Sequence, residues 1–142
     1  MIYLDSSALV KLALTDLESA ALAGWLAERA DQPLVCSALY RAEVPRAVWR
    51  AEPGALPRAY RLIRRIARVA LTADVLDNSA TVPPQALSPA HAIHLASAME
   101  LRGELTAFVA YDEDLLAAAA DAGLPIVSPG RTGKPQNAAD SV

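Results

Sequence analysis

Short apolar runs alternate with longer amphipathic stretches along the chain. The runs cover residues 2–4, 33–36, 69–71, 107–111 and 125–127. Runs this short, bounded by polar or helix-breaking residues, predict buried strands. The stretches between them repeat apolar residues at helical spacing. Strands that alternate with helices predict an α/β fold, a three-layer arrangement with a short, mostly parallel sheet flanked by helices.

Polar residues with capping ability mark where most of these helices should begin. Asp5, Ser37, Ser88 and Asp112 each precede a helical stretch and can accept hydrogen bonds from its first turn. The expected helices cover residues 8–14, about 17–30, the stretch from Ser37 to the Glu52-Pro53-Gly54 break, 57–68, 73–80, the stretch from Ser88 to Gly103, and 112–122. From Pro129 the sequence is polar and rich in helix breakers. We therefore expect one domain over residues 1–128 and a flexible polar tail over residues 129–142.

Composition narrows the class of protein. The 142 residues are 54% hydrophobic and 20% charged, which suits one folded domain and excludes disorder over most of the length. No apolar run approaches the length of a membrane span, and no signal peptide precedes the first strand. The single Cys36 cannot form an internal disulfide, so we expect a cytoplasmic protein.

Charge is distributed unevenly. The formal net charge is −3, but residues 41–68 contain eight arginines and only two acids, which gives +6 there and −9 elsewhere. On the expected helix over residues 57–68, Arg58, Arg61, Arg65 and Arg68 share one face. A basic segment on an acidic protein is typical of a phosphate-binding surface, and a solvated helix face is the alternative.

Acidic residues stand at the ends of two predicted strands. Asp5 follows the first strand directly, and Asp112 follows the strand over residues 107–111. Either residue alone could be a simple helix cap. The carboxyl ends of parallel strands lie at one edge of the sheet, where ligands bind in such folds. The pair therefore predicts a shared crevice.

Further acids could join this crevice. Glu43 lies on the apolar side of its helix, between Leu39 and Ala47, where a carboxylate needs a metal or a polar partner. A salt bridge to Arg46 or Arg50 is the alternative. Asp114 and Glu113 stand in the first turn of the last long helix, where acids also suit the helix dipole.

Three or four carboxylates from distant parts of the chain favour Mg²⁺ or Mn²⁺. A closed zinc site is disfavoured because thiolates are absent from the set. The His91 and His94 pair, three residues apart, leaves a histidine zinc site as a minor alternative. Carboxylates that hold such a cation suit hydrolysis of a phosphodiester.

Three segments resemble one family. Residues 2–10 (IYLDSSALV), 92–98 (AIHLASA) and 108–112 (FVAYD) are similar to PIN-domain ribonucleases, specifically to VapC toxins of type II VapBC toxin–antitoxin pairs. The resemblance extends over about residues 1–128. It implies a divalent-metal-dependent endoribonuclease, a homodimer, an RNA substrate and a VapB-like antitoxin as partner.

The resemblance also assigns the metal site. Family members place acids where this chain has Asp5, Glu43 and Asp112, and many have a further acid that corresponds to Asp114. Where the family has an Asp before the Ala-Ile-His sequence, this chain has His91. An imidazole is a poor ligand for Mg²⁺ and a better one for Mn²⁺. His94 is implied to support the site from its helix.

Two other functions remain open from the sequence. A PIN fold weakened by His91 could bind antitoxin or RNA and cleave poorly. A phosphoryl-transfer domain of receiver or haloacid-dehalogenase type also uses an Asp after the first strand, but the latter needs a second Asp where this chain has Ser7. For the ribonuclease, the arginines Arg46, Arg58, Arg61 and Arg65 are the candidate contacts to the RNA backbone.

Overall fold

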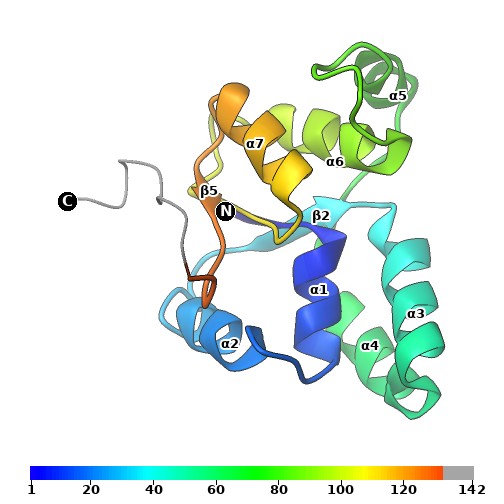
Figure 1. The fold of residues 1–142 in the computed structure, drawn as a ribbon, viewed down its shortest axis with the longest axis vertical. Helices are drawn as coiled ribbons and strands as arrows, with labels where there is room; N and C mark the ends of the chain where they lie inside the picture. The colour runs from blue at the N-terminus through cyan, green and yellow to red at the C-terminus, as the bar shows by residue number, and fades with distance from the viewer. Residues whose placement is uncertain (133–142) are drawn as a thin grey trace.

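A parallel sheet forms the centre of the computed structural model, which describes residues 1–132, and helices pack on both of its faces (Figure 1). The strands pair in the order β3-β2-β1-β4-β5, and every pairing is parallel. The strands are β1 Ile2–Leu4, β2 Leu34–Ser37, β3 Ala67–Val69, β4 Ala107–Val109 and β5 Ile126–Val127. The predicted α/β fold with a parallel sheet is confirmed.

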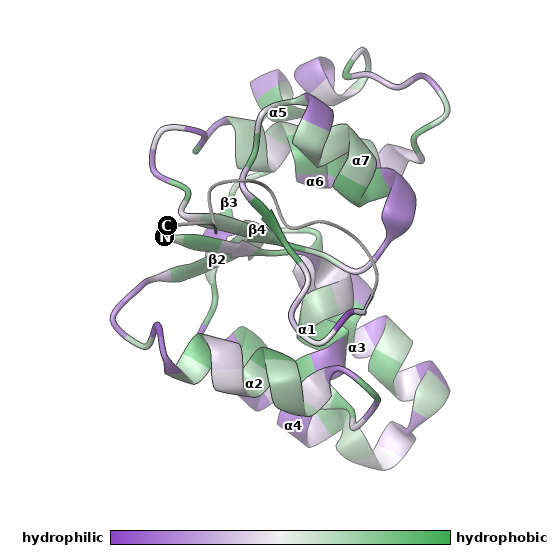
Figure 2. Ribbon diagram, turned by 60° about the vertical axis from the view of Figure 1, so that its left-hand side comes forward, coloured by the Kyte–Doolittle hydropathy of each residue, from purple (hydrophilic) through white to green (hydrophobic). Residues whose placement is uncertain are grey.

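Two groups of helices sandwich the sheet. Figure 2 shows α1, α2, α3 and α4 on one side and α5, α6 and α7 on the other. Their bounds are α1 Ser6–Ala13, α2 Ser19–Ala27, α3 Tyr40–Ala51, α4 Leu56–Ile63, α5 Ala73–Ser79, α6 Pro89–Met99 and α7 Glu113–Asp121, with a short 3-10 helix over Pro53–Ala55. Because both faces of the sheet are covered, β1 and β4 are buried along their whole length.

The strand order reverses between β1 and β4. From β1 the chain moves outward through β2 to β3, and it then returns to β4 on the other side of β1. Ligands of open α/β sheets bind at such a reversal, beyond the carboxyl ends of the strands. The Asp5 amide donates to the carbonyl of Val109 over 2.8 Å, so the ends of these two strands are joined. The topology therefore makes neighbours of the two strands that precede Asp5 and Asp112.

Aromatic packing fixes the central strands against each other. Tyr3 of β1 and Phe108 of β4 stack with ring centroids 5.1 Å apart, and both side chains are fully buried. Leu4, Leu9 and Leu115 are also fully buried around them. Burial of a large apolar side chain contributes about 1.5–3 kcal/mol. Large, fully buried side chains thus support the strands β1 and β4 that lead into the site.

The helix predicted over residues 57–68 is too long. Helix α4 ends at Ile63, and Ala67–Val69 instead forms β3, in which Arg68 is paired with Cys36 of β2. The shared face of four arginines is therefore wrong, because Arg65 lies in the turn and Arg68 lies on a strand. Pairing with the open edge of β2 outweighs the local helical pattern in this stretch.

Tyr40 of α3 stabilises the end of α4. Its hydroxyl donates to the carbonyls of Ile63, over 3.3 Å, and Ile66, over 3.0 Å. Carbonyls at the end of a helix lack partners within the helix, so a buried phenol that pairs with them favours termination there.

The residues after β5 lie against the domain. The Tyr111 hydroxyl donates to the Pro129 carbonyl over 2.7 Å, and Arg131 bonds to Glu113 and to the Tyr111 carbonyl. These contacts belong to the first residues of the expected tail, and residues 133–142 lie outside the described part of the chain. No helix within residues 1–132 is long and apolar enough to cross a membrane.

Gly130 provides a test of this packing. Its φ is +84°, and a Cβ at this position would lie 2.7 Å from the Cβ of Ala21 on α2. Gly130→Ala should lower the free energy of unfolding by about 1–3 kcal/mol through backbone strain and this close contact. Gly123→Ala is the matched control, because Gly123 has a φ of +81° but open space around it. Urea denaturation of both variants separates the two causes, and equal losses would contradict the close approach to α2.

Candidate active site

Asp5 is a buried carboxylate with only one of its two oxygens paired. It is 2% exposed and caps α1, where Oδ2 accepts from the Ser7 amide over 3.1 Å and the Ser7 hydroxyl over 2.7 Å. Its Oδ1 has no hydrogen-bond partner and lies 3.5 Å from Nδ1 of His94. A buried charged oxygen without a hydrogen-bond partner is costly unless a cation approaches it. Asp5 therefore caps α1 through Oδ2, while among residues 1–132 its Oδ1 makes no hydrogen bond and has only the His94 ring as a nearby positive group.

His94 joins Glu43 to the end of the sheet. Its Nε2 lies 2.6 Å from Glu43 Oε1, and its Nδ1 lies 2.8 Å from the Tyr3 hydroxyl. The Tyr3 hydroxyl in turn accepts from the Ser37 amide over 3.0 Å, while the Ser6 hydroxyl donates to Glu43 Oε1 over 2.9 Å. This chain of contacts, which we call the His94 network, links β1, β2, α1, α3 and α6.

The His94 network favours an ionised pair. Burial alone would lower the pKa of His94, but the hydrogen bond with Glu43 and the negative charges of Asp5 and Glu43 raise it above its ordinary value. Burial alone would raise the pKa of Glu43, but His94 and the Ser6 hydroxyl lower it. A protonated imidazole can donate from both nitrogens, which matches the two contacts made by His94. Glu43 is thus held as a carboxylate in a fixed orientation.

The sequence anticipated that Glu43 needs a partner and did not identify which. The partner is His94 on α6, and Glu43 makes no salt bridge to Arg46 or Arg50, both of which are exposed. The resemblance to PIN domains implied that His94 supports the site, but it did not identify Glu43 as the residue that His94 contacts. His94 is fully buried, a position that a polar ring occupies only when its nitrogens are paired.

His91 and Asp112 lie together at the mouth of the site. The His91 Nδ1 is 3.7 Å from Asp112 Oδ1, and the electrostatic interaction of Glu43 with His91 is the smallest of the contributions that lower the pKa of Glu43. Asp112 Oδ1 also accepts from the Leu115 amide over 2.9 Å and caps α7. Asp114 is exposed in the first turn of that helix. The replacement of the expected Asp by His91 therefore lies within the site.

Ser7 holds the two strand ends at a fixed separation. Its hydroxyl donates to Asp5 Oδ2 and accepts from the Tyr111 amide over 3.2 Å. The same side chain thus orients the carboxylate after β1 and the backbone after β4. Ala110, the residue before Tyr111, is fully buried next to this contact.

The chemistry of these donors fits a hard cation, although the side chains do not form a closed ligand set. Within residues 1–132 no three His, Cys, Asp or Glu side chains are grouped closely enough to hold a metal ion. Glu43 is engaged by His94, and Asp112 by His91 and its own helix. Oδ1 of Asp5, which makes no hydrogen bond, and the carboxylates of Glu43 and Asp112 are the kind of donors that Mg²⁺ and Mn²⁺ prefer. The two histidines have different partners, so they do not favour a zinc site.

The basic segment is exposed. All eight arginines from Arg41 to Arg68 are solvent-exposed, and none of them forms an ion pair with any residue in the described part of the chain. Arg46 lies over the Trp49 ring, 5.9 Å from its centroid. The predicted RNA contacts Arg46, Arg58, Arg61 and Arg65 are therefore free to meet a ligand.

The chain belongs to the PIN-domain family. The match to the PIN domain covers residues 2–121. This range includes all five residues predicted to surround the metal, Asp5, Glu43, His91, Asp112 and Asp114.

Relatives within that family are VapC proteins. The chain is 40% identical to ribonuclease VapC35 of Mycobacterium tuberculosis over 133 residues, which is 92% of this chain and 98% of the relative. It is 39% identical to ribonuclease VapC47 of the same species over the same shares, and 38% identical to ribonuclease VapC46 over 128 residues, or 90% and 97%. The resemblance to VapC ribonucleases is confirmed.

A solved structure supports the fold. The crystal structure of Mycobacterium tuberculosis VapC20, described as a toxin that cleaves the sarcin-ricin loop, superposes with a TM-score of 0.68. The alignment covers 91% of this chain and all of that one, at 21% sequence identity. At this identity the likeness shows that the two proteins share a fold.

The His94 network yields a stability prediction. Tyr3→Phe keeps the stack on Phe108 but removes the hydroxyl that pairs with His94 and with the Ser37 amide. Two buried polar groups would lose a partner, so the free energy of unfolding should fall by about 1–3 kcal/mol. Tyr60→Phe is the control, because the Tyr60 ring is 46% exposed and outside the network. Urea denaturation measures both, and a Tyr3→Phe protein as stable as the control would contradict the network.

Proposed function

We propose that this protein is the toxin of a type II toxin–antitoxin pair, a divalent-metal-dependent endoribonuclease that cleaves RNA phosphodiester bonds. The observation that carries the proposal is Oδ1 of Asp5, which is buried without a hydrogen bond at the strand reversal of a PIN domain. Relatives of nearly full length that are named ribonuclease VapC support the activity and the toxin assignment.

Asp5, Glu43 and Asp112 would hold the cation, Mg²⁺ or Mn²⁺, with Asp114 and His91 beside them. When bound, the cation supplies positive charge that stabilises the negative charge developing on the phosphoryl group. The protein's own contribution is preorganisation. Ser7 fixes Asp5, and the His94 network keeps Glu43 ionised and oriented before RNA arrives.

The exposed arginines would bring the RNA to this site. Arg46, Arg58, Arg61 and Arg65 have no acidic partner within residues 1–132, so their charges are available to phosphates. Contacts of this kind give affinity and a steep salt dependence without base specificity. Selection of the RNA target would then come from other contacts or from the shape of the RNA.

The partners follow from the same relationship. A VapB-like antitoxin would block the active-site groove, and the toxin would act as a homodimer in the cytoplasm. The buried, unpaired Cys36 suits a reducing compartment.

A PIN fold that binds RNA or antitoxin but cleaves poorly is the alternative that His91 raises. The ribonuclease names of its relatives favour catalysis.

Asp5→Asn tests the metal role directly. Asparagine still caps a helix well, so the stability should change by less than about 1 kcal/mol. Cleavage of RNA should fall by at least about 100-fold, because the carboxylate charge at the cation is lost. Asp16→Asn, which removes a surface carboxylate paired with Lys11, is the control and should cleave normally. An Asp5→Asn protein that loses stability but retains activity would show that capping is the main role of Asp5.

His91→Asp tests the position where this chain departs from its family. An aspartate would add a hard anionic oxygen beside Asp112, so Mg²⁺ affinity should rise by roughly tenfold and the preference for Mn²⁺ should fall. Titration of both metals into both proteins, with cleavage of one RNA as the readout, gives the comparison. His91→Ala separates the added oxygen from simple loss of the imidazole. Unchanged affinity and rate in His91→Asp would place position 91 outside the ligand set.

A further inference from the structure

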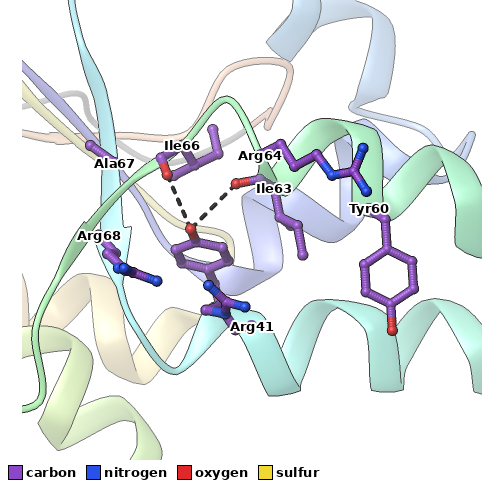
Figure 3. A pocket seen from close by; sticks show the side chains of 8 residues that line it. Arg41, Tyr60, Ile63, Arg64, Ile66, Ala67 and Arg68 are labelled. Carbon is purple, nitrogen blue, oxygen red and sulfur yellow. Dashed lines mark hydrogen bonds between the residues drawn. The ribbon is translucent and has the colours of Figure 1, made fainter.

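A second group of arginines, distinct from the predicted RNA contacts, gathers in one pocket. The pocket, about 550 Å³ in volume, lies between the start of α3, the end of α4 and β3. Arg41, Arg64 and Arg68 line it together with Tyr40 and Tyr60 (Figure 3). These arginines come from a helix, a turn and a strand, so no sequence periodicity groups them. We refer to this group of five residues as the Arg41 pocket.

The two tyrosines have different roles in this pocket. Tyr40 is 4% exposed, and its hydroxyl is occupied by the carbonyls of Ile63 and Ile66 (Figure 3). It therefore contributes a fixed wall. Tyr60 is 46% exposed, and its hydroxyl makes no hydrogen bond within residues 1–132. Its ring offers an open aromatic face at the edge of the pocket, next to Arg64.

The charge of the Arg41 pocket is uncompensated. None of its arginines has an ion pair within the described part of the chain, and no acidic side chain lines the pocket. Three guanidinium groups around one cavity repel one another, and an anion that enters relieves that repulsion. Guanidinium groups match the geometry of phosphate oxygens, which they can bind through two parallel hydrogen bonds.

The Arg41 pocket and the candidate active site share one helix. Arg41 and Glu43 both lie in the first turn of α3. Residues two apart on a helix point to opposite sides, so α3 separates the pocket from the His94 network. A helix with its side chains is about 10 Å wide. An RNA strand with one phosphate at Asp5 can therefore pass over the start of α3. A neighbouring nucleotide of the same RNA would then lie at Arg41.

We propose that the Arg41 pocket binds a phosphodiester of the RNA strand away from the scissile bond, with the adjacent base stacked on Tyr60. The proposal rests on the proposed function and adds a second anchoring point to it. Arginine with an exposed aromatic ring is the combination that binds single-stranded nucleic acid without sequence preference. Two fixed points on one strand set which bond lies at the metal site, so the pocket would contribute to the choice of cleavage position.

Binding, measured without cleavage, tests the pocket. The full chain with Asp5→Asn, in the absence of divalent cations, is titrated against a fluorescein-labelled single-stranded RNA of about 12 nucleotides, with anisotropy as readout. Arg41→Gln, Arg64→Gln and Arg68→Gln should each weaken binding roughly threefold to tenfold. Each should also lower the slope of log affinity against log salt by about 0.7. Tyr60→Leu should weaken binding about fivefold or more and leave the salt slope unchanged.

Control experiments distinguish binding of RNA in the pocket from a general effect of positive charge on the protein surface. Arg102→Gln removes the same charge from an exposed residue outside the basic segment and should change affinity little. A trinucleotide, which is too short to reach both the pocket and the active site, should bind the parent protein more weakly than the longer RNA does. Thermal unfolding of each variant verifies the fold.

Three results would overturn the inference. The first is unchanged affinity and salt slope in the arginine variants. The second is an equal loss in Arg102→Gln. The third is that the arginine variants bind RNA normally but lose affinity for an oligoglutamate peptide. This result would assign the pocket to binding of an acidic protein segment. Failure of the wild-type protein to cleave RNA would refute the proposed function, and the binding experiment would still decide the role of the pocket.

Discussion

The contact between His94 and Glu43 is the constraint on which the rest of the site depends. The fully buried imidazole of His94 would lose its hydration without compensation if it had no polar partner, and the part-buried carboxylate of Glu43 on α3 provides one. Together they hold two helices on opposite faces of the sheet in one register. Tyr3 extends the contact to β1 and β2. The position of Glu43 beside Asp5 is therefore set by the domain as a whole.

The site combines rigid support with unsatisfied acceptors. Ser7 and the cap of α1 fix one oxygen of Asp5, while the other is buried without a hydrogen bond, 3.5 Å from Nδ1 of His94. Such an arrangement destabilises the protein slightly in the absence of a cation and favours binding of one. The basic segment shows a similar combination. The Tyr40 hydroxyl fixes the turn after α4 through the carbonyls of Ile63 and Ile66, while the arginines of this segment form no ion pair within residues 1–132.

Local signals in the sequence were sufficient for most of the fold. The caps at Ser88 and Asp112 and the apolar run of β1 predicted elements that the structure confirms. These local signals gave wrong or incomplete predictions where a residue's structure depends on a partner that is distant in the sequence. Arg68 fits a helical pattern but pairs with Cys36 on β2, and Glu43 pairs with His94 fifty-one residues later. Strand pairing and buried ion pairs depend on the assembled sheet, so periodicity alone could not reveal them.

The edge strand β3 has a further consequence for the behaviour of the protein in a crowded solution. An open sheet edge presents unpaired amides and carbonyls that can recruit another strand and start aggregation. β3 is only three residues long, and its central residue is the exposed Arg68. A second copy approaching this edge would have to bring like charges together along a very short ladder. The arginine that lines the pocket therefore also opposes the addition of a further strand at the β3 edge.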